Sequence, residues 1–189
     1  GIRDQVRQGK AIPSQYRIPS VYLKEMIDLY AEMEYENVIR LAKRALENTD
    51  NIDARIVGEI RNRMCLAMAK MKQDECLEEA QLLDSENRGF IYAFYYRQIG
   101  KNDKALYELD RLLENRASFS QAKREKVLVL TRLQQFDEAL ILARENNYLY
   151  PDNPYHIQAY FDCLIHTMSY KDDEFLEKIQ ELLERLQRI

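Results

Sequence analysis

Glycine and proline are scarce in this sequence, which contains five glycines and four prolines among 189 residues. So few of these residues leave little material for tight turns, which argues against an all-β fold. Leucine, alanine, glutamate, lysine, arginine and glutamine dominate instead, and they lose little rotamer freedom in a helix. Charged residues are 32% of the chain and hydrophobic residues 46%, which is typical of a globular protein. We therefore expect an all-α fold.

Cysteine is also sparse, and long apolar runs are missing. The three cysteines, Cys65, Cys76 and Cys163, form no C-x-x-C pair, which is typical of free thiols in a reducing compartment. No apolar run approaches the roughly 18 residues that a membrane span needs, and no signal-peptide pattern opens the chain. The formal net charge of −4 disfavours nucleic acid and anionic membranes as partners. We expect a cytoplasmic protein that binds neither nucleic acid nor a membrane.

The sequence lacks the common enzyme motifs. There is no glycine-rich phosphate loop and no H-E-x-x-H pattern. The only histidines, His156 and His166, lie on one predicted helix with side chains about 80° apart, which does not suit a shared metal. Cys65 has no identifiable histidine partner and is interpreted as a small buried residue. We predict no enzyme, cofactor, metal or small-molecule ligand.

The first 19 residues differ from the rest. Arg3, Arg7, Lys10 and Arg17 outnumber a single acidic residue there, and prolines at positions 13 and 19 prevent a continuous helix. We predict a basic linker or arm over residues 1–19 and one helical repeat domain over residues 20–189. The arm would either contact phosphate or an acidic surface, or remain a solvated linker.

After residue 20 the helical periodicity is nearly continuous and indicates ten helices. Connections of about 2–5 residues make neighbouring helices antiparallel. The predicted helix ends are marked by Gly100 as a left-handed C-terminal residue, Asn102 or Asp103 as an N-cap, Ser118 with Gln121 as a capping box, and Asn153-Pro154 as an N-cap and first helical residue.

Two segments with a similar residue pattern lie in the middle of the chain. They run from Gly100 to Leu106 and from Gln134 to Leu140, and place Ala105 and Ala139 34 positions apart. A period of 34 residues with paired helices is the signature of one solenoid family. The equivalent positions are Val38, Cys76, Ala105, Ala139 and Leu176.

The chain resembles the tetratricopeptide repeat (TPR) family, most clearly over residues 87–152. The matching residues are Ala93, Tyr96, Gly100 and Ala105 in one hairpin, and Phe136, Asp137, Ala139, Ala143 and Pro151 in the next. The tryptophan of the family pattern is absent throughout. The resemblance implies a right-handed α-α superhelix of about five helical hairpins. A related irregular α-solenoid is the alternative architecture.

In this family the first helix of each hairpin lines a concave face. The resemblance therefore implies an apolar groove edged by arginines, which would bind a peptide segment or a partner helix. Leu23 and Ile27 stand where the family's peptide-carboxylate clamp has Lys and Asn, which argues against that ligand. Alternatively, Phe90, Phe94 and Phe161 belong to a partly buried core, or are covered by the protein's own arm or by domains outside this chain. The implied groove consists of Leu23, Ile27, Arg61, Phe90, Phe94, Arg97, Arg124, Leu128, Arg132, Phe161 and Ile165.

These features favour a non-enzymatic protein–protein interaction module. The alternative is a sensor or regulatory TPR domain of a multidomain signalling NTPase or effector, with its catalytic part outside this chain. The last predicted helix, residues 172–189, carries a wide apolar stripe. That stripe would cap the solenoid, or would mediate self-association or the docking of further repeats.

Enlarging either Ala105 or Ala139 to leucine tests the repeat. Overpacking at such a position should lower the free energy of unfolding by about 1–3 kcal/mol, because the two helices of a hairpin approach closely there. Urea denaturation of each variant measures the change. An unchanged free energy of unfolding would contradict the assigned close approach.

Overall fold

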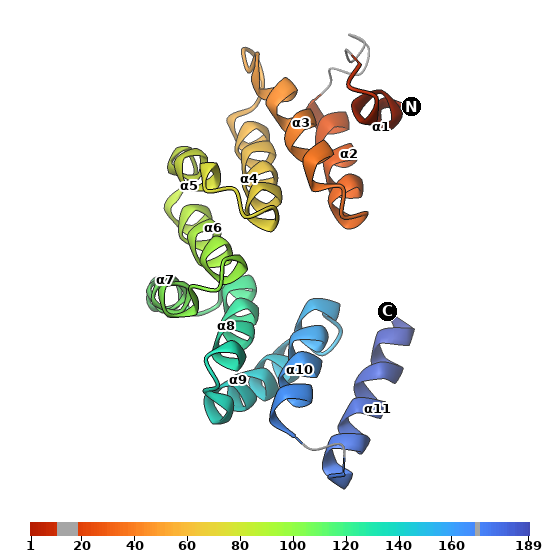
Figure 1. Cartoon of the computed structure of the whole chain (residues 1–189), viewed down its shortest axis with the longest axis vertical. Helices are drawn as coiled ribbons and strands as arrows, with labels where there is room; N and C mark the ends of the chain where they lie inside the picture. The colour runs from red at the N-terminus through yellow and green to blue at the C-terminus, as the bar shows by residue number, and fades with distance from the viewer. Residues whose placement is uncertain (11–18, 169–170) are drawn as a thin grey trace. The chain divides into compact units, whose positions relative to one another are not determined.

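The structure, a computed structural model, describes residues 1–10, 19–168 and 171–189. Within these ranges it contains helices and turns and no β-strand, which confirms the all-α fold (Figure 1). The helices are α1 (Ile2–Arg7), α2 (Pro19–Ala31), α3 (Tyr35–Leu46), α4 (Ala54–Lys70), α5 (Glu75–Glu79) with the 3-10 turn η2 (Ala80–Leu82), α6 (Ser85–Gln98), α7 (Asn102–Asn115), α8 (Ser120–Arg132), α9 (Phe136–Leu149), α10 (Pro154–Thr167) and α11 (Asp173–Arg188).

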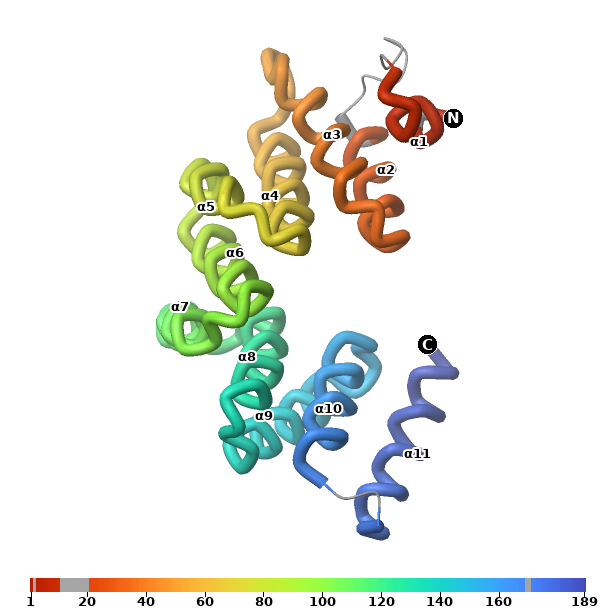
Figure 2. Tube along the Cα trace, in the orientation of Figure 1, coloured from red at the N-terminus to blue at the C-terminus, as the bar shows by residue number. Residues whose placement is uncertain are grey.

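The helices form two compact units, residues 1–99 and 100–189. In the first unit, α2 pairs with α3 and α4 with α5, and the helices α2, α4 and α6 pack side by side (Figure 2). In the second unit, α7 packs on α8, α8 pairs with α9, and α10 packs on both α8 and α9. Within each unit, the first helices of successive hairpins are therefore neighbours, as in a TPR-like solenoid.

One backbone turn recurs at the ends of α2, α4, α6 and α8. Gly100 has a φ of +79°, which confirms its predicted left-handed conformation. Met33, Lys72 and Gln134 adopt the same conformation, with φ of 62°, 58° and 60°. The N–H that follows each of these three donates to the carbonyl five residues back, the Schellman pattern that ends a helix, at 2.9, 2.9 and 3.0 Å. The sequence predicted this turn only where glycine marks it.

Small side chains follow each turn and are sealed between helices. Val38, Ala105 and Ala139 lie five residues after Met33, Gly100 and Gln134 and are each 0% exposed, which confirms them as equivalent positions. Cys76 is also 0% exposed but lies four residues after Lys72, one residue out of that register. Leu176 is 53% exposed, so its assignment as the fifth was wrong. In α11 it is Leu182, on another side of the helix, that enters the core of the second unit. The last helix therefore does not repeat the earlier hairpins.

The predicted helix caps are only partly right. Asn153 is confirmed, because its side-chain oxygen accepts from the next two free N–H groups of α10 at 3.0 and 3.3 Å. Asn102 and Ser118 were wrongly assigned. Lys101 precedes α7, and Phe119 precedes α8, and neither caps with its side chain. Phe119 is buried, so packing of its ring sets where α8 begins.

A helix not predicted from the sequence lies in the basic arm. The helix α1 packs against α2 and α3, and Val6 is fully buried there. Its basic side chains contact acidic residues, as one of the two predictions for the arm has it. Residues 11–18, which include Pro13 and Arg17 of the predicted arm, lie outside the described residues.

Two glycines should respond oppositely to replacement by alanine. Nothing lies near an added Cβ at Gly100, so its left-handed backbone alone should cost about 1 kcal/mol in Gly100→Ala. Gly58 lies inside α4 with open space at its Cβ position, so Gly58→Ala should stabilise by up to about 1 kcal/mol through helix propensity. Urea denaturation measures both. Changes of the same sign would contradict these backbone assignments.

Candidate protein-binding surfaces

The groove residues predicted for the first unit are unequally exposed. On α2, Leu23 is half-buried and Ile27 is exposed. On α6, Phe90 and Phe94 are 7% and 5% exposed, and their rings stack with centroids 6.1 Å apart. Their burial agrees with the alternative in which these phenylalanines belong to the core.

Two cations lie over the Phe94 ring. The ammonium of Lys70, on α4, lies 5.5 Å from the centre of the Phe94 ring, and the guanidinium of Arg97 lies 5.4 Å from it. A cation over an aromatic face is attracted by the ring's quadrupole. Arg97 therefore lies at the edge of the aromatic pair, while the rings themselves lie inside.

Arg61 contacts the second helix of its own hairpin. Its guanidinium forms an ion pair with Glu79 on α5. The neighbouring thiol of Cys65 is buried, and burial raises its pKa to about 12. The same effect raises the pKa of Cys76 to about 12. Because a nucleophilic cysteine needs an accessible thiolate, the interpretation of Cys65 as a small buried residue is confirmed.

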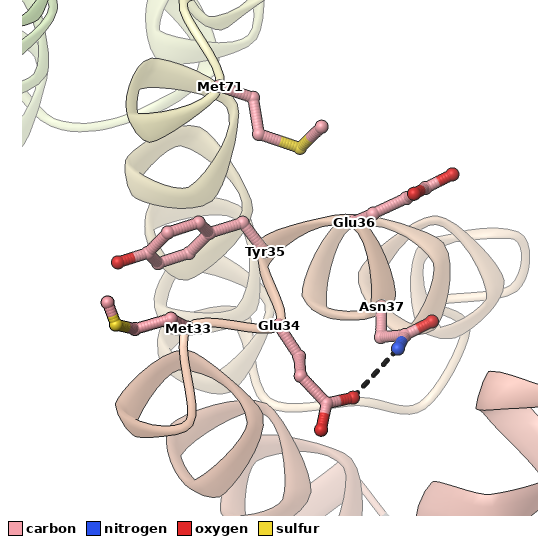
Figure 3. A pocket seen from close by; sticks show the side chains of 6 residues that line it. All are labelled: Met33, Glu34, Tyr35, Glu36, Asn37 and Met71. Atoms are coloured by element: carbon pink, nitrogen blue, oxygen red, sulfur yellow. Dashed lines mark hydrogen bonds between the residues drawn. The ribbon is translucent and has the colours of Figure 1, made fainter.

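An open cleft of about 300 Å³ lies beside the α2–α3 turn (Figure 3). Met33 and Tyr35 at the turn line it together with Met71, which follows α4. The Glu34 carboxylate points away from the methionines and accepts a hydrogen bond from the Asn37 side chain at 2.8 Å. Met33 is strongly exposed, so the cleft offers adaptable thioether surface at its rim.

In the second unit, a stripe on α8 meets a stripe on α10. Arg124 and Leu128 are half-buried and lie one turn apart on α8. The Arg124 guanidinium lies 5.3 Å from the centre of the Tyr155 ring, on the first turn of α10. Tyr155 is 59% exposed and was missed by the groove prediction. The sequence signal that could have identified it is its position directly after Asn153-Pro154, which places Tyr155 on the first turn of the predicted helix.

Arg132 continues the same stripe one turn beyond Leu128. It forms a two-point ion pair with Asp162 of α10, at 3.1 and 3.3 Å. His166 lies one turn after Asp162 on α10, and its Nδ1 is 2.7 Å from the Asp162 backbone oxygen. Ile165 is 52% exposed and lies on the exposed side of α10, while Phe161 is half-buried. The predicted residues Arg124, Leu128 and Arg132 thus follow one another on one side of α8, and Arg124 and Arg132 contact α10.

A buried histidine lies behind this surface. His156 is 3% exposed; its Nε2 lies 2.7 Å from the Ser120 hydroxyl, and its ring stacks on Tyr150 at 4.6 Å. Burial, with Arg124 and Lys123 nearby, lowers the pKa of His156 to about 4. The histidine is therefore neutral near pH 7 and acts as a packing residue that joins α8, α9 and α10.

The described residues hold no group of three or more His, Cys, Asp or Glu side chains suited to a metal ion. In the same part of the chain, no helix is both long and apolar enough to cross a membrane.

Comparison with known proteins supports the fold. No protein-family model and no curated protein matches the chain. Among solved structures, MamA AMB-1 in its P212121 crystal form is 17% identical with a TM-score of 0.56, and covers 89% of this chain and 99% of that one. MamA MSR-1 in its C2 form is 20% identical with a TM-score of 0.54, over 89% and 98%. These structural matches show that the chain shares a TPR-like all-α solenoid fold. At such low sequence identity they show nothing about shared function.

His156 should make the protein sensitive to acid. Its pKa is about 4 in the folded state and near 6.5 when unfolded, so the unfolded state gains the proton first as the pH falls. The neutral His156 ring makes its full contribution to the free energy of unfolding above pH 6.5. Between pH 6.5 and 4 that free energy falls by roughly 2–3 kcal/mol. Urea denaturation should show that the free energy of unfolding falls between pH 7 and 4.5 in the wild type. The fall should be smaller in His156→Gln by about this amount.

His166→Gln is the matched control, because it changes an exposed histidine on the same helix. Equal acid dependence in wild type and His156→Gln would show that the buried ring does not control it.

Proposed function

We propose that this chain is a non-enzymatic protein-interaction scaffold that binds a protein segment on one face of its second unit. This α8–α10 face consists of Arg124, Leu128, Arg132, Tyr155 and Ile165. Support comes from the repeated helical hairpins, the TPR-like fold shared with MamA, and the mixture of exposed aromatic, aliphatic and arginine side chains. Such mixtures are typical of the residues that dominate binding energy at protein interfaces.

The exposed Tyr155 ring beneath Arg124 is the observation that carries the proposal. A tyrosine supplies a large contact area with only two side-chain torsions to fix. The guanidinium at 5.3 Å restricts the ring further, so little entropy remains to be lost on binding. An exposed but pre-positioned aromatic ring therefore favours a docking surface over a merely solvated one.

The Arg132–Asp162 pair supplies the polar part of the face. Arg132 is partly exposed, and exposed ion pairs contribute little to stability. A partner carboxylate can therefore replace Asp162 in the fork of the guanidinium at small cost. With Ile165 on the exposed side of α10, the face suits a segment that carries an apolar residue near an aspartate or glutamate.

The proposed face is narrower than the groove predicted from the sequence. Phe90 and Phe94 are buried and support the surface of the first unit from inside. Leu23, Ile27 and Arg97 stay part of the prediction for that unit as an additional contact surface.

Panning a random peptide display library on the whole chain tests the function. Selected peptides are then measured by fluorescence anisotropy against wild type and the double variant Tyr155→Ala/Ile165→Glu. Both side chains are exposed, so the variant should fold normally, and binding should weaken by at least about tenfold through loss of the aromatic anchor.

Tyr148→Ala is the matched control, because it removes a more exposed tyrosine from α9. Its affinity for the selected peptides should equal that of wild type. Undiminished affinity of the double variant would show that the α8–α10 face is not the binding surface, and failure to select any peptide would oppose the scaffold function itself.

A further inference from the structure

The docked helix α1 shows how the first unit holds a basic segment. Arg3 lies 2.8 Å from a carboxylate oxygen of Glu25 and 2.6 Å from one of Glu32. Arg7, one turn later, lies 2.9 Å from Glu32 and donates from its Nε to Glu34 at 2.8 Å. Three carboxylates from α2 and the α2–α3 turn thus form an acidic clamp, Glu25, Glu32 and Glu34, around two arginines.

The C-terminal end of α1 is also held through its backbone. Arg40 donates to the Val6 carbonyl at 2.6 Å, and Arg44 donates to the carbonyl of Gly9 at 3.1 Å and to that of Lys10. Arg40 and Arg44 lie one turn apart on α3. Cations are favoured at the C-terminal end of a helix, where carbonyls lack partners inside the helix. This part of the surface recognises a helix end and not a particular side chain.

One apolar side chain completes the contact. Val6 is 0% exposed although α1 lies at the edge of the unit. A fully buried valine side chain adds hydrophobic stabilisation to the contact. The docked segment therefore presents three elements to the unit: two arginines four residues apart, an aliphatic residue just before the second arginine, and the carbonyls of a helix end.

The docked state can be exchanged. Six residues are too few to form a stable helix in water, so α1 owes its helicity to docking. The side chains of Arg3, Arg7 and Glu32 remain partly exposed, and such ion pairs are individually weak. An intrachain segment held by weak contacts gains mainly from its high effective concentration.

We propose that the surface formed by the acidic clamp with Arg40 and Arg44 is a docking site for a short basic helix of a partner protein, and that α1 is its intrachain occupant. The partner segment carries the pattern Arg-x-x-aliphatic-Arg and ends as a helix close to the second arginine. It replaces α1 in the same contacts, with the arginines on the carboxylates and the helix end on Arg40 and Arg44. The clamp lies in the first unit and makes no use of the α8–α10 face, so the two proposals can fail separately.

The experiment uses the full chain and a fluorescent peptide with the sequence of residues 1–10. In the variant Arg3→Glu/Arg7→Glu, α1 is repelled by the carboxylates and leaves the site open. The peptide should bind this variant at least about tenfold more tightly than wild type, whose own arm competes. Circular dichroism confirms that the helical content is kept. Arg3→Gln/Arg7→Gln gives the same readout if charge reversal unfolds the chain.

Two controls define the chemistry. The same peptide with glutamate in place of both arginines should not bind the variant. Adding Glu32→Arg and Glu34→Arg to the variant should return its arm to the surface and abolish binding of the original peptide. Equal binding of the peptide to wild type and variant, or binding to neither, would overturn the proposal. Sedimentation showing that wild type self-associates through this clamp would assign the site to a second copy and would also overturn it.

Discussion

The close approach of paired helices is the constraint on which the rest of the structure depends. Paired helices such as α8 and α9 can pack tightly only where the facing side chain is small and fully enclosed, as at Ala139. The left-handed turn before each such position reverses the chain in very few residues. Together they fix which side of each first helix faces its neighbours, and so which side remains free for partners.

The same constraint explains what the sequence could predict. A small residue that recurs after 34 positions and a glycine at Gly100 are local signals, and both survive in the structure. Met33, Lys72 and Gln134 adopt the same turn without glycine, because helix pairing on both sides holds them there. The assignment of Leu176 failed because α11 turns its Leu182 side into the core of the second unit, so the spacing of the earlier repeats is not kept there.

The candidate surfaces were less predictable than the fold. Periodicity places Phe94 and Tyr155 on helices, but it does not tell which aromatic ring is covered by a neighbouring helix. Phe94 is enclosed beneath Lys70 and Arg97, whereas Tyr155 on the first turn of α10 remains open beside a single arginine. The docking of α1 was also hidden, because six residues have too short a pattern to reveal an amphipathic helix. Both cases depend on contacts between residues distant in sequence.

The buried thiols provide internal reporters of local opening. Cys65, Cys76 and Cys163 are enclosed, and burial raises the pKa of each, so none is a reactive thiolate in the closed structure. An alkylating reagent can reach them only when the surrounding helices separate. Two thiols lie in the first unit and one in the second, so their labelling rates measure the opening of each unit separately. The native chain therefore carries a built-in probe of whether ligand binding to one unit stabilises the other.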